Sequence, residues 1–144
     1  MGENKYDCLR LENQLCFPLY ACSKEIIKKY NAILGKYDLT YTQYIAMMAI
    51  WEHKQINIKD LGNCLFLDSG TLTPLVKKLE SKGYINRTRS KEDERNLVIS
   101  ITKKGEDLKE DLVTIPEQIG KSINLEPDEA KFLYKILYKI IECK

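Results

Sequence analysis

The cysteines are the most reactive side chains of this chain, and their spacing limits the chemistry they can do. They are Cys8, Cys16, Cys22, Cys64 and Cys143. No two of them have CxxC spacing, and the single His53 cannot complete a zinc cluster of cysteine and histidine ligands. We therefore expect no metal site, no cofactor and no framework of disulfides.

A free thiol in a reducing compartment has two roles open to it. It is most often a small apolar side chain that fills a core. A thiolate that a peroxide can reach instead attacks the O–O bond and becomes a sulfenic acid, the first and reversible product of thiol oxidation. Composition alone leaves both roles open for each cysteine.

The stretch LENQLCFPLYACSKE, at 11–25, places Cys16 in a long helix that we predict over 9–34. Its apolar residues recur at helical spacing and are Leu11, Leu15, Leu19, Ile26, Tyr30 and Ile33. Pro18 lacks a backbone N–H, and its ring clashes with the carbonyl of Gln14 four residues earlier. We expect a kink or local unwinding there, and we expect Cys16 to lie too far inside the helix to use its N-terminus.

A winged helix-turn-helix is predicted over 41–102. The strongly apolar run 41–53 indicates a helix central to the core, with Thr40 as its N-cap. A short helix follows from about Asn57, and after a turn a second helix runs over 69–82. The strand-like runs YINRTR and NLVISIT are joined by the charged SKEDER, which predicts a β-hairpin with a hydrophilic tip. Two short helices followed by such a hairpin are typical of DNA-binding proteins.

One face of the second helix and the hairpin suit DNA. The residues expected to bind from the helix are Asp68, Ser69, Gly70, Thr71, Thr73, Lys77 and Lys78. The residues expected to bind from the wing are Arg87, Arg89, Lys91, Asp93 and Arg95. Hydroxyls beside a helix N-terminus suit phosphates and base edges, and lysines add salt-dependent backbone contacts. We expect Asp68 to cap the helix and the Asp93 carboxylate to hold the Arg95 guanidinium in place.

The rest of the sequence completes a single domain, 1–144, that is mainly α with a small β-hairpin wing (α+β). One helix is predicted from about 103 as far as Ile119, and another begins at Pro127. A chain of 144 residues with 44% apolar residues can bury one core. No apolar run of about eighteen residues is present, and the N-terminus is polar, so we expect a cytoplasmic protein with no membrane partner.

Three stretches resemble the MarR family of bacterial repressors, and specifically its organic hydroperoxide resistance (OhrR-type) branch. They are LENQLCFPLYACSKE, TYTQYIAMMAIWEH and LDSGTLTPLVKKLE, the last of which continues into a DxR wing. The resemblance covers about residues 5–115. It implies a symmetric homodimer whose helices over 9–34 and 103–142 interlock, with one winged unit on each half-site of a pseudo-palindromic double-stranded DNA operator. It also implies a transcriptional repressor with no catalytic residues.

The resemblance further implies that Cys16 is the redox-sensing cysteine. Relatives stabilise this thiolate with tyrosines that match Tyr30 and Tyr41, across the dimer interface, and with a third that matches Tyr20. No Lys, Arg or His lies within one helical turn of Cys16, so tyrosine hydroxyls are also the donors the local sequence leaves. Aromatic walls favour an organic hydroperoxide as the oxidant.

The step after sulfenic acid formation has two open routes. Condensation with a low-molecular-weight thiol needs no second cysteine, and we favour this one-cysteine mode. Cys22 and Cys143 remain secondary candidates, although Cys143 lies later than the resolving position of two-cysteine relatives. Cys8, Cys22 and Cys64 match no such position.

We predict that oxidation of Cys16 breaks the tyrosine hydrogen bonds, shifts the helices of the dimer interface and moves the two recognition helices off successive major grooves. One alternative is a repressor released by a non-covalent phenolic or drug-like effector. Another is a broader thiol-based redox or virulence regulator. A thiol peroxidase is disfavoured, because such an enzyme needs an evident resolving partner and has no use for a DNA-reading wing.

Overall fold

An irregular segment precedes the first helix of the chain. The structure, a computed structural model, describes residues 4–93 and 95–143. Its first elements are the 3-10 turns η1 (Asp7–Leu9) and η2 (Leu11–Asn13), followed by α1 (Cys16–Leu34). The prediction of a continuous helix from residue 9 is therefore wrong over 9–15.

Pro18 explains why α1 begins where it does. It is the third residue of the helix, where a backbone N–H would have no intrahelical acceptor. Its missing N–H therefore costs no helical hydrogen bond, and its fixed φ suits the first turn. The kink that we expected inside a longer helix is replaced by a helix start.

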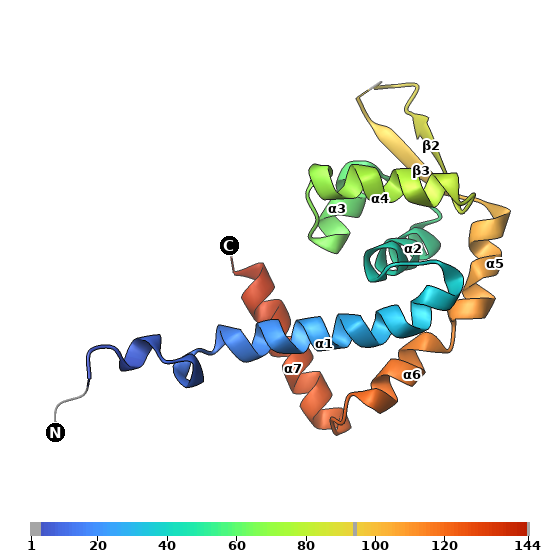
Figure 1. Ribbon diagram of the computed structural model, residues 1–144. Helices are drawn as coiled ribbons and strands as arrows, with labels where there is room; N and C mark the ends of the chain where they lie inside the picture. Colours follow the sequence, from blue (N-terminus) through green and yellow to red (C-terminus); the bar gives the residue numbers. More distant parts are fainter. Residues whose placement is uncertain (1–3, 94, 144) are drawn as a thin grey trace. The chain divides into compact units, whose positions relative to one another are not determined.

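Helices α2, α3 and α4 form the body of the winged unit, with α3 and α4 side by side next to α2 (Figure 1). Their bounds are α2 (Tyr41–His53), α3 (Ile58–Leu65) and α4 (Ser69–Ser81), and η3 (Gly35–Tyr37) joins α1 to α2. Thr40 Oγ1 accepts the backbone N–H of Gln43 at 3.3 Å, and Gln43 Oε1 accepts the backbone N–H of Thr40 at 3.2 Å. This capping box confirms the predicted N-cap.

The core of this unit lies between these helices and the sheet. Its fully buried side chains include Met47, Ile50, Leu61, Leu72, Val76, Leu79, Ile85 and Ile99. The all-round apolarity of α2 is confirmed as a sign of central burial, because most of its residues from Gln43 to Ile50 are buried.

The wing is two strands of a three-stranded antiparallel sheet. The strands are β1 (Gln55–Asn57), β2 (Ile85–Arg89) and β3 (Leu97–Ile101), in the order β1-β3-β2. In the register, Arg87 of β2 and Ile56 of β1 both lie opposite Ile99. The predicted hairpin is confirmed, and β1 is an additional strand that the sequence did not reveal.

Helix α5 (Lys103–Leu112) joins the root of the wing to α2. Trp51 Nε1 donates a hydrogen bond to the carbonyl oxygen of Gly105 at 2.8 Å, and Lys54 forms an ion pair with Glu106. A Cβ on Gly105 would lie 2.2 Å from the carbonyl oxygen of Tyr84, so only glycine fits. Tyr84 directly precedes β2, and this close approach therefore fixes the start of the wing.

The chain divides into two compact units, Met1–Leu112 and Val113–Lys144. The second holds α6 (Ile115–Ser122) and α7 (Pro127–Glu142). The expectation of one helix from about 103 through Ile119 is wrong, because α5 and α6 are separate helices.

Helix α7 has no buried residue and exposes a row of large apolar side chains. They include Phe132, Leu133, Ile136, Ile140 and Ile141. Pro127 is its first residue, as predicted. Among the described residues, no helix combines the length and apolarity needed to cross a membrane.

Candidate nucleic-acid interface and thiol site

The start of α4 is held by Asp68. Its Oδ1 accepts the backbone N–H of Thr71 at 2.8 Å, which confirms the predicted N-cap. The hydrogen bond from the Thr71 backbone is the main cause that lowers the pKa of the Asp68 carboxyl below its usual range. Asp68 therefore stays ionised at neutral pH and fixes the first turn of the helix.

The two faces of α4 are as the sequence predicts. Leu72, Leu75, Val76 and Leu79 are buried. Ser69, Gly70, Thr71, Lys77 and Lys78 are exposed, and Thr73 is half-buried. Small hydroxyl residues thus lie at the positive N-terminal end of the helix, and the lysines lie one to two turns further along.

Pro74 is a feature of α4 that the sequence reasoning missed. It lies inside the helix, six residues into it. Because proline lacks an N–H, the helix has no donor for the carbonyl of Gly70 four residues earlier. The first turn of α4 therefore lacks one of its regular helical hydrogen bonds.

Arg87 links the wing to α4. Its Nε and Nη2 donate to Oε1 of Glu80 at 3.1 and 3.0 Å, and its backbone N–H donates to Oε2 at 3.0 Å. The hydrogen bond from the Arg87 side chain is the main cause that lowers the pKa of the Glu80 carboxyl. We expected Arg87 to reach DNA, and the structure places its guanidinium on a carboxylate of the recognition helix.

The tip of the wing is a turn held by Asp93. Its Oδ1 accepts the backbone N–H of Arg95 at 3.0 Å, and its carbonyl accepts the backbone N–H of Asn96 at 2.9 Å. The expected contact of this carboxylate with the Arg95 guanidinium stays a prediction, and the contact that the structure gives is with the backbone, through which the carboxylate shapes the turn. Glu94, counted among the charges of SKEDER, lies outside the described residues.

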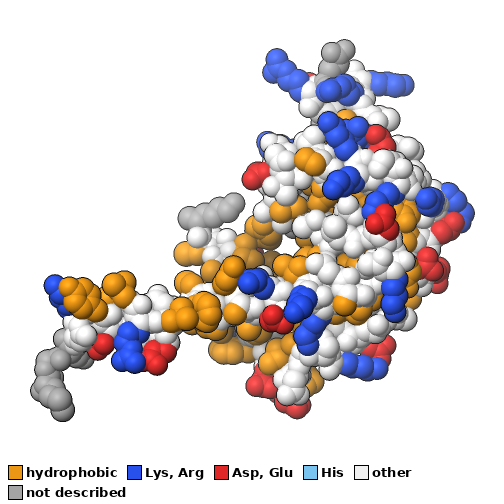
Figure 2. Space-filling model, viewed as in Figure 1, with side chains coloured by type: hydrophobic (Ala, Val, Ile, Leu, Met, Phe, Trp, Pro, Cys, Tyr) orange, Lys and Arg blue, Asp and Glu red, His pale blue; other side chains and the backbone are white. Residues whose placement is uncertain are grey.

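Basic side chains gather at the tip of the wing, as Figure 2 shows. Arg89, Lys91 and Arg95 are all exposed there. Together with Lys77 and Lys78 they place positive charge on the wing and on α4. This distribution of charge suits a surface that binds the phosphate backbone of DNA, even though the formal net charge of the whole chain is only +2.

Cys16 is the first residue of α1 and is exposed. The expectation that it lies too far inside a helix to use the N-terminus is wrong, because α1 begins seven residues later than the predicted boundary at residue 9. The unpaired backbone N–H groups of a first turn favour negative charge. The structure therefore places the Cys16 side chain at the N-terminal end of α1, a position that the sequence analysis excluded.

Of the three tyrosines predicted to act on this thiol, Tyr20 is the one on the same helix. It follows Cys16 by four residues, which places both on one face of α1. The side chain of Tyr20 is exposed, and the Nζ of Lys24 lies 5.1 Å from the centre of its ring.

Tyr30 and Tyr41 form a separate aromatic cluster with Tyr44. The ring centres of Tyr30 and Tyr41 are 4.7 Å apart, and Tyr44 lies 5.8 and 6.5 Å from them. Burial raises the pKa of Tyr30 and of Tyr41, and it raises that of Tyr44 to about 12. The hydroxyls therefore keep their protons at neutral pH and can donate hydrogen bonds.

Sequence reasoning missed Tyr44, although a signal was present. It follows Tyr41 by three residues in α2, so both lie on one face of that helix.

The structure does not bring Cys16 and Tyr30 together within one chain. Both lie on α1, fourteen positions apart, which separates them by about 21 Å along the helix axis. A contact between this thiol and the aromatic cluster must therefore join two copies of the chain.

The other cysteines, Cys8, Cys22, Cys64 and Cys143, are exposed and free. No group of three or more His, Cys, Asp or Glu side chains among the described residues is arranged to hold a metal ion.

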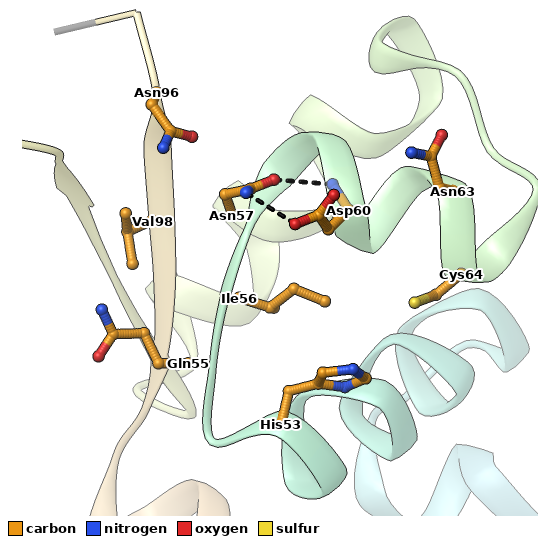
Figure 3. Close-up of a pocket in the computed structure, with 9 residues that line it drawn as sticks. All are labelled: His53, Gln55, Ile56, Asn57, Asp60, Asn63, Cys64, Asn96 and Val98. Carbon is orange, nitrogen blue, oxygen red and sulfur yellow. Dashed lines mark hydrogen bonds between the residues drawn. The ribbon is translucent and has the colours of Figure 1, made fainter. Parts of the chain in front are cut away.

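A hollow of about 640 Å³ lies at the base of the wing, where α2, α3 and the sheet meet (Figure 3). Its lining residues include His53, Asn57, Asp60, Cys64 and Asn96. Asn57 and Asp60 are engaged with each other, since Nδ2 of Asn57 donates to Oδ2 of Asp60 at 2.8 Å. The sequence analysis did not point to this hollow.

Sequence comparisons place these features among transcriptional regulators. The family model "Transcriptional regulator SarA/Rot" matches residues 28–112. The HTH-type transcriptional regulator SarZ of Staphylococcus saprophyticus is 54% identical over 131 residues, which are 91% of this chain and 90% of that protein. The organic hydroperoxide resistance transcriptional regulator of Bacillus subtilis is 47% identical over 140 residues, 97% of this chain and 95% of that protein.

Solved structures of AbfR, a protein of Staphylococcus epidermidis, are also similar. Reduced AbfR bound to DNA is 32% identical, with a TM-score of 0.79, and the match covers 96% of this chain and 97% of that one. Overoxidized AbfR bound to DNA is 33% identical, with a TM-score of 0.79 and coverage of 96% and 98%. A disulfide-formed AbfR is 32% identical, with a TM-score of 0.66 and coverage of 95% and 96%.

Proposed function

Because this chain belongs to the SarA/Rot family of transcriptional regulators, of the MarR-like winged-helix type, we propose that it is a repressor that senses organic hydroperoxides through Cys16 and then releases its operator. The observation that carries the proposal is an exposed cysteine at the first residue of α1, in a chain 47% identical to an organic hydroperoxide resistance regulator. The relatives are transcriptional regulators, and the proposal assigns no enzymatic activity.

DNA binding would use α4 and the wing of two copies. A homodimer has two such units, and recognition helices one turn of DNA apart, about 34 Å, read the two halves of a pseudo-palindromic operator. The hydroxyls of Ser69 and Thr71 and the ammonium groups of Lys77 and Lys78 would bind phosphates and base edges. The basic side chains of the wing tip would lie along the neighbouring backbone.

Exposed apolar surface on α1 and α7 supports the homodimer. Leu15, which directly precedes α1, is 83% exposed, and Phe132 of α7 is 66% exposed. Figure 2 shows hydrophobic side chains gathered along α1 and the segment before it. Exposed apolar surface of this extent marks an interaction site, and a second copy would cover it.

Oxidation would begin with attack of the Cys16 thiolate on the O–O bond of a hydroperoxide. The sulfur takes the distal oxygen and becomes a sulfenic acid, the O–O bond breaks, and the alkoxide leaves as an alcohol after taking a proton. Tyr30 and Tyr41 of a second copy, whose hydroxyls stay protonated, would donate hydrogen bonds to the sulfur. Their aromatic rings would favour an oxidant with an organic tail.

Release of DNA would follow from a disulfide at Cys16. A thiol of low molecular weight attacks the sulfenic sulfur, water leaves, and the mixed disulfide adds bulk at the start of α1. That bulk must displace the helices that join the two copies, which respaces the recognition helices. In AbfR the overoxidized form is bound to DNA and a disulfide-formed state also exists, and the proposal assigns release in this chain to the disulfide.

The test follows fluorescence anisotropy of a labelled duplex from the gene's own upstream region. Wild type and Cys16→Ser bind it in the reduced state, and cumene hydroperoxide is then added with a small thiol. Wild type should be released at about one equivalent of peroxide per chain, while Cys16→Ser stays bound. Cys64→Ser, which removes another exposed thiol, should be released like wild type. Retention of both wild type and Cys16→Ser would contradict the proposal.

A repressor released by a non-covalent effector is the second candidate. The hollow at the base of the wing favours it, because amide, imidazole and carboxylate groups line a space large enough for a small organic molecule. If wild type resists peroxide, a panel of phenolic compounds in the same anisotropy assay tests this candidate. Release that Asn57→Ala abolishes would support it.

A further inference from the structure

Cys8 lies in a folded segment that leads directly to Cys16. Nδ2 of Asn13 donates to the carbonyl of Asp7 at 2.8 Å, and Nε2 of Gln14 donates to the carbonyl of Cys8 at 2.6 Å. Together with the 3-10 turns η1 and η2, these side-chain bonds fold the chain back on itself between residues 7 and 14. The Gln14 side chain thereby holds the backbone of Cys8 by a hydrogen bond, and Gln14 is two residues before Cys16.

Both thiols of this segment are exposed. The Sγ of Cys8 makes one weak local contact, with the carbonyl oxygen of Lys5 at 3.5 Å. No residue of η1 or η2 is buried, so the segment opens at low cost compared with the core. Cys8 is therefore close to Cys16 along the chain and on a backbone that can move.

The other thiols are worse placed to reach Cys16 within one chain. Cys22 lies on α1, about 9 Å further along the axis of a regular helix. Cys64 lies in α3, a helix of the DNA-binding body. Cys143 lies at the end of α7, in the second compact unit.

We propose that Cys8 is the resolving thiol of Cys16, within the same chain. This inference rests on the proposed function, since the oxidant is the organic hydroperoxide that converts the Cys16 thiolate to a sulfenic acid. The Cys8 thiolate then attacks the sulfenic sulfur. The S–S bond forms, the S–O bond breaks, and the departing hydroxide takes up the proton that the Cys8 thiol released on ionisation and leaves as water.

The disulfide would change the start of α1. A disulfide requires Cα atoms about 4.4–6.8 Å apart, so the backbone between Cys8 and Cys16 has to hold that separation. Closing the disulfide would break the hydrogen bonds that the side-chain amide of Gln14 donates to the carbonyls of Cys8 and Arg10. It would also disturb the first turn of α1. An intrachain thiol also has an effective concentration in the mM range, so it competes with thiols of low molecular weight.

The test treats the reduced protein with one equivalent of cumene hydroperoxide and no added thiol, in a Cys22→Ser background. Trypsin then cuts after Lys5, Arg10 and Lys24, so that Cys8 and Cys16 fall on different peptides. Non-reducing mass spectrometry should find peptides 6–10 and 11–24 joined, two hydrogens lighter than their sum. A non-reducing gel should show a single-chain band.

Cys8→Ser, in the same background, is the informative variant, because its exposed side chain leaves the fold intact. It should keep Cys16 as a sulfenic acid that dimedone labels, whereas protein with Cys8 should show little label. Equal dimedone labelling with and without Cys8, or a link only between two chains, would overturn the inference and leave the proposed function standing. No oxidation of Cys16 in either protein would instead remove the proposed function itself.

Discussion

The guanidinium of Arg87 in β2 lies 3.0 Å from the carboxylate of Glu80 in α4, and the backbone N–H of Arg87 binds the same carboxylate. One side chain of the recognition helix thus holds the wing through three hydrogen bonds. The two DNA-binding elements are therefore coupled, and the angle between them depends on this pair.

Glu80→Gln should weaken operator binding several-fold. Removal of a negative charge near DNA would strengthen binding if simple electrostatics decided the outcome. A loss of affinity therefore reports that Glu80 positions the wing through Arg87. Anisotropy across a salt series measures it, and the slope of log K against log salt should match that of wild type because no phosphate contact is lost. Tighter binding of Glu80→Gln would contradict this role.

The same pair predicts a pH dependence of stability. Because Arg87 lowers the pKa of Glu80 from its ordinary 4.5, the pair stabilises the fold fully above that value and loses its contribution as pH falls below it. Melting temperatures of wild type and Glu80→Gln should differ at pH 7 and converge at acidic pH. A difference that stays constant down to pH ~3 would show that the pair does not couple to folding.

Lys77→Gln and Lys78→Gln should each reduce the salt slope of DNA binding by about 1, the loss of one phosphate contact. Both lysines are exposed on α4. Lys36→Gln is the matched control, because this exposed lysine lies in η3 rather than on α4 or the wing. An equal change in slope for Lys36→Gln would mean that α4 is not the binding surface.

Gly105→Ala should destabilise the first unit by about 3 kcal/mol, since a methyl group would collide with the backbone carbonyl of Tyr84. Gly35→Ala is its control, because nothing lies within 4 Å of a Cβ there and its φ of −57° suits alanine. Thermal unfolding followed by circular dichroism compares the two. Equal melting temperatures would show that the root of the wing moves to make room.

Tyr30→Phe and Tyr41→Phe should each slow oxidation of Cys16 about tenfold, the equivalent of one hydrogen bond to the thiolate. Tyr44→Phe belongs to the same aromatic cluster and is the control for changes in packing. The measurement is the rate at which the free Cys16 thiol is lost after addition of cumene hydroperoxide, followed by mass spectrometry. Unchanged rates in Tyr30→Phe and Tyr41→Phe would separate the cluster from the thiol.

The sequence predicted well the elements whose pattern is local and long. The cap at Thr40, the buried row of α4 and the wing hairpin follow from the types of neighbouring residues. The start of α1 did not follow, because 3-10 turns repeat every three residues and give apolar spacings close to those of a helix. Pro18 was the available signal, since proline is tolerated in a first turn.

Other features depend on contacts far apart in the chain. The three-residue strand β1 is too short to show alternation, and it exists because β3 pairs with it. The contact of Arg87 with Glu80 joins a strand to a helix. Arg87, which the sequence analysis expected to bind DNA, therefore has a partner within the protein. The pairing of Tyr30 with Tyr41 is likewise a contact between two helices.

The most direct measurement of the central claim compares two quantities on one sample. Cumene hydroperoxide is titrated into the protein–DNA complex with a small thiol present, and each point gives the released fraction by anisotropy and the Cys16 disulfide fraction by mass spectrometry. The account predicts that the released fraction rises in step with the fraction of Cys16 in a disulfide, whichever thiol is its partner. Full conversion of Cys16 with the DNA still bound, or release while Cys16 remains a thiol, would contradict it.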